Sequence, residues 1–82
     1  MSNIPSESEP TIVTHPVASS LIQSIGYDSA SETLQITFKS GGTYRYDNVS
    51  AQEWEAFRDA ESIGKHFYRS IKGKFPYRRV GA

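Results

Sequence analysis

The sequence contains no cysteine, so neither a disulfide nor a thiolate metal site is available to it. Its two histidines, His15 and His66, are too few for a zinc site without help from carboxylates. No apolar run approaches the roughly 20 residues that a membrane-spanning helix needs, and the N-terminus lacks the basic and apolar regions of a signal peptide. These absences predict a soluble, cytoplasmic protein without a metal or other cofactor.

Catalytic patterns are also missing. His66 has no carboxylate three or four residues away along a helix, and neither Ser19 nor Ser20 lies in the glycine pattern of a nucleophile elbow. The Gly41-Gly42 pair is not followed by the Lys-Ser/Thr of a phosphate-binding P-loop. We therefore expect a protein that is not an enzyme. A length of 82 residues allows one domain at most.

The formal net charge of zero conceals two ends of opposite sign. The first 62 residues hold only three cations against nine carboxylates. The last 20 hold no carboxylate and six cations, which are Lys65, Arg69, Lys72, Lys74, Arg78 and Arg79. Such a separation bears on the choice of partner. Either the two ends neutralise each other within the fold, or the basic end is held out for a polyanion, and the sequence leaves both open.

Residues 1–16 hold three of the four prolines together with serine and glutamate. This composition predicts a disordered or loosely docked tail, although Ile12 and Val13 allow a short edge strand. The ordered domain is expected over residues 17–80. Its first half contains strand-like segments with alternating apolar residues, at 21–27, 33–39 and 43–49.

The loop between the last two strands decides which face the tyrosines occupy. With a three-residue, glycine-containing loop at 40–42, Phe38 faces Tyr44. Ile36 then faces Tyr46 on the same side. A slip of one residue would put both tyrosines on the other face. We favour the three-residue loop because it groups the aromatic and aliphatic side chains.

A helix is predicted to follow the strands. Ser50 and Glu53 form a capping box at its start, and it runs to about Glu61. Trp54 and Phe57 fall at helical spacing and mark its buried face.

A second helix is predicted over residues 63–72, with Ser62 as its cap and Gly73 as the left-handed residue that ends it. Its apolar stripe consists of Ile63, Phe67 and Ile71. Residues 74–80 read as a basic, aromatic, extended tail. The order of elements predicts an α+β domain in which a three-stranded antiparallel sheet is followed by two helices packed on one face.

An ordered set of short motifs runs through the predicted domain. The motifs are Ser19-Ser20, Ile25–Asp28, Leu34–Phe38, Gly42–Tyr46 with its Tyr44-Arg45-Tyr46, Val49, Ala60–Phe67 and Ile71–Gly73. Together they resemble the KTSC domain. That family occurs at the C-terminus of some lysyl-tRNA synthetases and as small free-standing bacterial and phage proteins, to which this chain is similar. The resemblance implies an RNA-binding role through the synthetase context, and it supplies no catalytic residue.

Tyr44, Arg45 and Tyr46 are a first candidate site. Tyrosines exposed on a sheet stack on unpaired bases at about 1–3 kcal/mol each, and Arg45 would contact phosphate. The alternative places both tyrosines in the core with their hydroxyls at its rim. We favour the core because a domain this small needs every aromatic ring there.

The basic residues are a second candidate site. Lys65, Arg69 and Lys72 share one helix face, which the tail extends with Lys74, Arg78 and Arg79. This strip either binds phosphates or is an ordinary solvated helix face. It also has the option of pairing with Glu55 and Asp59 of the first helix, at about 0–1 kcal/mol per exposed pair.

Two functions are consistent with these features. The first is a small non-enzymatic module, monomeric or weakly dimeric, that binds RNA or single-stranded nucleic acid through the basic helix and tail. The second is a protein-interaction module, such as a phage-type accessory protein or inhibitor, that presents the same surface to an acidic host protein. Nucleic-acid binding falls steeply with salt, whereas a protein interface with an apolar centre tolerates it.

Overall fold

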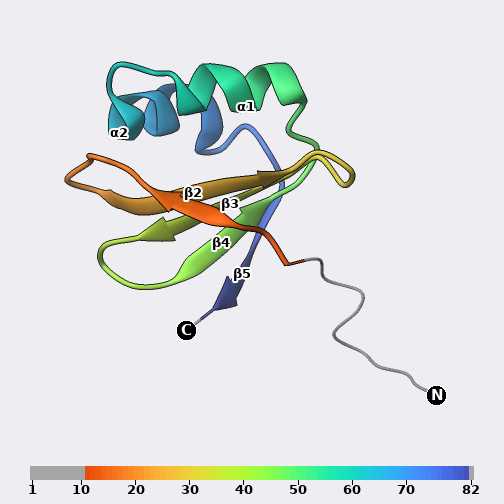
Figure 1. The fold of residues 1–82 in the computed structure, drawn as a ribbon, viewed down its shortest axis with the longest axis horizontal. Helices are drawn as coiled ribbons and strands as arrows, with labels where there is room; N and C mark the ends of the chain where they lie inside the picture. The colour runs from red at the N-terminus through yellow and green to blue at the C-terminus, as the bar shows by residue number, and fades with distance from the viewer. Residues whose placement is uncertain (1–10, 82) are drawn as a thin grey trace.

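The alternating segments of the sequence pair into one antiparallel sheet in the computed structural model, which describes residues 11–81. The five strands lie side by side in sequence order, and helices inserted between the fourth and fifth cover one face (Figure 1). The elements are β1 (Thr14–Pro16), β2 (Ile22–Asp28), β3 (Thr33–Phe38), β4 (Thr43–Tyr46), α1 (Ala51–Arg58), α2 (Ile63–His66), the π-helical turn η2 (Phe67–Ile71) and β5 (Tyr77–Gly81). The predicted α+β class and antiparallel sheet are confirmed, but the prediction lacked both outer strands.

The segment predicted as an extended basic tail forms β5. It returns to the edge of the sheet and pairs with β4, where Tyr77 lies opposite Tyr46 and Arg79 opposite Tyr44. Both helices separate these two strands along the chain. No hairpin signal in the local sequence therefore marks the pairing.

β1 lies at the opposite edge, inside the segment predicted as a tail. It pairs with β2, and the preceding Ile12 is buried. A Cβ on Gly26 would lie 2.3 Å from the carbonyl oxygen of Val13, so only glycine at this position lets the N-terminal segment approach β2 this closely. Residues 11–16 are thus packed on the domain, and residues 1–10 of the predicted tail lie outside the described residues.

The β3–β4 hairpin has a three-residue loop, but the loop begins one residue earlier than predicted. The Phe38 N–H donates to the Gly42 carbonyl at 3.1 Å, which closes the hairpin around residues 39–41. The observed pairs are Ile36 with Tyr44 and Leu34 with Tyr46. The predicted register is wrong by two residues because Gly41, at φ 106°, occupies the last loop position rather than its middle. A slip of two keeps every side chain on its predicted face.

The core lies between the sheet and the helical layer. Its buried residues come from both layers, and they are Ile22, Ile25, Leu34, Ile36, Tyr46, Val49, Phe57, Ile63, Phe67 and Ile71. The predicted burial of Phe57 and of the Ile63–Phe67–Ile71 stripe is confirmed. Fully burying one such side chain contributes about 1.5–3 kcal/mol. Trp54, by contrast, is only partly buried.

The predicted helix starts are confirmed. The Ser50 hydroxyl accepts from the Glu53 N–H, and the Ser62 hydroxyl accepts from the Lys65 N–H. The first helix ends at Arg58, one turn earlier than predicted.

The second helix changes from α to π at Phe67, which the sequence did not predict. The Lys72 N–H donates to the Phe67 carbonyl at 2.8 Å, the wider spacing of a π turn. Apolar residues spaced four apart can lie on one face of an α-helix or of a π-helix. The spacing of the stripe therefore does not reveal the change from one to the other. Gly73 ends the helix at φ 77°, as predicted. Among residues 11–81, no helix is long and apolar enough to cross a membrane.

Candidate binding cavity

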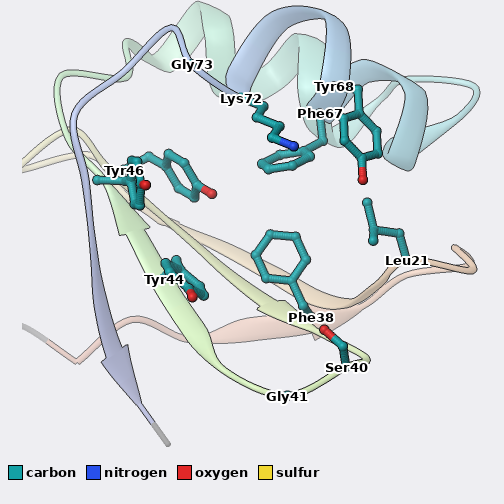
Figure 2. Close-up of a pocket in the computed structure, with 11 residues that line it drawn as sticks. Leu21, Phe38, Ser40, Gly41, Tyr44, Tyr46, Phe67, Tyr68, Lys72 and Gly73 are labelled. Atoms are coloured by element: carbon teal, nitrogen blue, oxygen red, sulfur yellow. The ribbon is translucent and has the colours of Figure 1, made fainter.

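The helical layer does not cover the sheet completely. At the end of the covered face where the β3–β4 hairpin turns, a cavity of about 470 Å³ opens between β3, β4 and β5 on one side and η2 on the other (Figure 2). Its lining consists of Leu21, Phe38, Ser40, Gly41, Tyr44, Tyr46, Phe67, Tyr68, Lys72, Gly73 and Tyr77.

Strand alternation aims the sheet rings into this cavity. Tyr44 and Tyr46 are two residues apart on β4 and point to the helical side, where Tyr77 of β5 lies opposite Tyr46. The centroids of the Tyr46 and Tyr77 rings are 5.7 Å apart, and those of Tyr44 and Tyr77 are 6.0 Å apart. Two strands that are distant in sequence, β4 and β5, thus build one aromatic wall.

The helix supplies the facing wall. The Phe67 ring meets Phe38 edge-on at 5.3 Å and Tyr46 at 5.9 Å, which closes the floor of the cavity. Tyr68 and Tyr77 stand at the rims with 57% and 62% of their surface exposed, so more than half of each residue is accessible to solvent. Buried floor rings and exposed rim rings give the cavity a fixed base and accessible edges.

The floor of the cavity is neutral, and its rim carries a positive charge. Burial raises the pKa of Tyr46 to about 12, and the neighbouring phenols of Tyr77 and Tyr44 add to the shift. Its hydroxyl therefore stays protonated at neutral pH. At the rim, the Lys72 ammonium lies 4.8 Å from the centre of the Tyr68 ring, a cation–π contact. Figure 2 shows this ammonium directed toward the cavity.

The structure divides the predicted site residues between two faces of the sheet. Tyr44, Tyr46 and Lys72 line the cavity. The preference for the core is confirmed for Tyr46, which is 5% exposed, while Tyr44 is half-buried. The Arg79 guanidinium lies beside Gly42 near the cavity.

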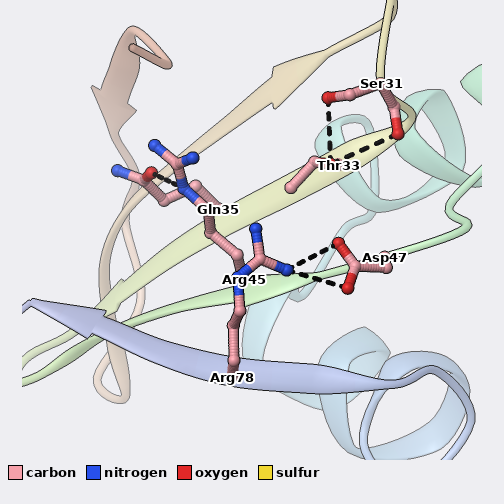
Figure 3. Close-up of polar contacts among 6 residues, drawn as sticks. All are labelled: Ser31, Thr33, Gln35, Arg45, Asp47 and Arg78. Carbon is pink, nitrogen blue, oxygen red and sulfur yellow. Dashed lines mark hydrogen bonds and ion pairs between the residues drawn. The ribbon is translucent and has the colours of Figure 1, made fainter. Parts of the chain in front are cut away.

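The other predicted cations lie farther from the cavity or on the opposite face of the sheet. Lys65, Arg69 and Lys74 are exposed on the helical segment and the turn after it. Arg45 and Arg78 face the helix-free side of the sheet (Figure 3). Tyr44, Arg45 and Tyr46 consequently do not form one platform, because adjacent strand residues point to opposite faces.

On the helix-free face, the two arginines hold strands together. Arg45 is 7% exposed, and its Nε donates to the side-chain oxygen of Gln35 at 2.8 Å. The Nη1 of Arg78 donates to both carboxylate oxygens of Asp47, at 2.9 and 2.8 Å. Both Arg78 and Asp47 remain about 40% exposed, so their pair contributes at most about 1 kcal/mol. The predicted pairing of the basic end with acidic residues is therefore real for Arg78, but its partner Asp47 directly follows β4 and does not belong to α1.

Sequence reasoning missed four lining rings, Phe38, Phe67, Tyr68 and Tyr77, as parts of a site. Tyr68 carried the one usable signal, since it is an aromatic residue outside the apolar helix stripe and four residues before Lys72. Tyr77 became a cavity residue only through the non-local β4–β5 pairing. Within residues 11–81, no group of three or more potential ligands is placed to hold a metal ion.

The fold and this cavity define a small α+β domain with a sheet, a helical layer and an aromatic opening between them. The model of the KTSC domain family matches residues 18–75, and the chain belongs to that family. A crystal structure of a KTSC domain protein from Yersinia pestis superposes with a TM-score of 0.84 at 42% identity, covering 87% of this chain and all of that chain.

Two relatives in sequence differ in size. An uncharacterized protein of Stutzerimonas stutzeri is 39% identical over 54 residues, which cover 66% of this chain and 76% of that protein. A lysine–tRNA ligase of Nostoc punctiforme is 38% identical over 61 residues, which cover 74% of this chain but 11% of the ligase. The chain thus corresponds to about a tenth of the ligase's length.

Proposed function

We propose that this protein is a non-enzymatic binding module for single-stranded nucleic acid, RNA foremost, that takes an unpaired base into the aromatic cavity. The cavity itself carries the proposal. Its volume of about 470 Å³ falls within the roughly 300–1,000 Å³ typical of small-ligand sites. Unpaired bases stack on aromatic rings at about 1–3 kcal/mol per base. The bases of a duplex cover one another's faces, so only a single strand can offer one to these rings.

The charges around the cavity suit the phosphates of such a strand. Lys72 lines the cavity and Arg79 lies beside Gly42. The same helical segment and the turn after it carry three more exposed cations, which are Lys65, Arg69 and Lys74. Phosphate contacts of this kind position a strand without reading its sequence. Arg45 and Arg78, on the other face, have no part in this proposal.

The relatives support RNA as the natural ligand. The Nostoc protein is by name a ligase that joins lysine to tRNA, and a segment similar to this chain makes up about a tenth of it. RNA binding would account both for the presence of a similar segment in a tRNA ligase and for its occurrence as a small protein.

Fluorescence anisotropy of a labelled single-stranded RNA, about ten nucleotides long so as to span the cavity and the cations, tests the proposal. If four cations neutralise phosphates, log affinity should fall against log salt with a slope of roughly −3. Lys72→Gln should weaken binding and flatten the slope by roughly 0.7. Arg58→Gln removes the same charge from α1, where Arg58 pairs with Asp59, and should leave binding unchanged.

The same RNA annealed to its complement should bind more weakly than the single strand. Absence of binding to RNA and DNA at ~50 mM salt, where electrostatic attraction is strong, would contradict the proposal. The acidic protein partner would then become the better explanation of the basic surface. Equal loss in Lys72→Gln and Arg58→Gln would show that charge is sensed without any role for the cavity.

A further inference from the structure

A second cavity of about 400 Å³ adjoins the first. Leu21 and Tyr68 line both, so the two cavities meet at these two side chains. Figure 2 shows Tyr68 descending from the helix toward Leu21 at one side of the first cavity. The two cavities are therefore neighbours on one surface, with Tyr68 and Leu21 at their common border.

The two cavities differ in chemistry. The first is lined mainly by aromatic rings, whereas the second presents the side chains of Ser19, Ser20, Glu61 and Lys65. The Ser19 oxygen is held in place because it accepts from the N–H groups of Leu21 and Ile22 at 3.1 and 3.2 Å. A flat apolar group therefore suits the first cavity, and a group with hydrogen-bonding edges suits the second.

Each cavity has one lysine. Lys72 lines the first and Lys65 the second, and Tyr68 lies between them on the same helical segment, three residues after Lys65 and four before Lys72. This order fits a ligand with two planar units joined by an anionic link. The link would pass over Tyr68, between the two lysines. The carboxylate of Glu61 disfavours phosphate in the second cavity, and it accepts hydrogen bonds from exocyclic amino groups of bases.

We propose that the two cavities are successive subsites for two adjacent nucleotides of one strand, the first stacking any base and the second preferring a base that carries an exocyclic amino group. The inference rests on the proposed function and adds the number of nucleotides bound and the difference between their two subsites. Cytosine and uracil separate the two roles well, since both are single rings and only cytosine carries the amino group.

The test compares labelled hexamers of cytidylate and uridylate at neutral pH by fluorescence anisotropy. The protein should bind the cytidylate hexamer about tenfold more tightly, the gain expected from one hydrogen bond to a charged acceptor. Glu61→Gln should bring the ratio of the two affinities close to one, because an amide accepts from cytosine and donates to uracil. Glu55→Gln, the same change on the exposed face of α1, should leave the ratio unchanged.

The outcomes separate this inference from the proposed function. If both hexamers bind equally to the wild-type protein, or if Glu61→Gln keeps the ratio, the second subsite is refuted while single-strand binding stands. If neither hexamer binds, the proposed function fails first. Tyr68→Ala should weaken the binding of both hexamers by several fold, since Tyr68 lines both subsites. Because Tyr68 is exposed, the variant should keep its fold, and circular dichroism checks that it does.

Discussion

The two ends of the helix-covered face use aromatic residues in opposite ways. At the end covered by α1, which we call the closed end, Trp54 stacks on Tyr27 with ring centres 5.4 Å apart and planes 7° apart, and Phe57 is fully buried. At the hairpin end, the open end, rings from four elements surround empty space instead of filling it. The same residue types thus build stability at one end and leave accessible ring surface at the other.

That difference is informative because a small domain has little apolar surface to spare. A chain of this size buries only about 60% of the surface of its unfolded form. Closing the open end with aliphatic side chains would add stability, whereas the observed Tyr68 and Tyr77 leave more than half of their surface in water. Exposed aromatic surface bordered by lysine is the kind of feature that binding maintains.

The largest expected effect tests the closed end. Phe57→Ala should lower the free energy of unfolding by about 3–5 kcal/mol, because it empties a fully buried site between α1 and the sheet. Urea denaturation followed by circular dichroism measures the change. A loss below about 1 kcal/mol would show that α1 is not anchored by this ring and would remove the contrast between the ends.

The pH dependence of stability sharpens the comparison. Because burial raises the pKa of Tyr46 in the folded state to about 12 from its ordinary 10.0, folding favours the protonated phenol. Stability from this group is therefore complete below pH 10 and is lost as the pH rises through 12. The pKa of Tyr27, at the closed end, is also raised, by burial first and by Glu32 and Asp28 next.

We expect Tyr46→Phe to flatten the alkaline loss of stability more than Tyr27→Phe does. The measurement is the urea midpoint of each variant between pH 9 and the alkaline limit of reversibility, with tyrosinate absorbance as a direct monitor. A larger effect from Tyr27→Phe would reverse our account of which phenol is more deeply buried.

The smallest expected effect on stability is at the rim of the open end. Tyr77→Ala should cost less than about 1 kcal/mol of unfolding free energy, because the side chain is 62% exposed, yet it should weaken RNA binding several fold. Parallel urea and anisotropy measurements on the same protein separate the two effects. A large loss of stability with unchanged binding would make Tyr77 a structural residue and count against the cavity.

The strand faces and the burial of Phe57 at the closed end could be predicted from sequence, whereas the stack of Trp54 on Tyr27 could not. The alternation in β3 placed Tyr44 and Tyr46 on the helical side even though the predicted register was two residues out, because side-chain direction repeats every two residues. The cap residues Ser50 and Ser62 and the helix-ending Gly73 are local signals, and all three were recognised. Burial of Phe57 followed from helical spacing alone.

The open end could not be predicted, because it depends on non-local pairing and on a change of helix type. Tyr77 enters the cavity only when β5 returns to β4, and no residue near it in sequence indicates that partner. The π turn at Phe67–Ile71 is hidden by a spacing that an α-helix also satisfies. For the same reason, the basic strip predicted as one surface divides, with Arg78 bound to Asp47 on the opposite face.

Chemical-shift mapping of the isotope-labelled protein with a short single-stranded RNA tests the central claim most directly, since it reports on both ends at once. The account predicts shifts at the open end, in the signals of Tyr44, Tyr68, Lys72 and Tyr77. The indole of Trp54 and the ring of Tyr27 should stay unchanged. Shifts confined to the closed end or to Arg45 and Arg78 on the helix-free face would contradict it.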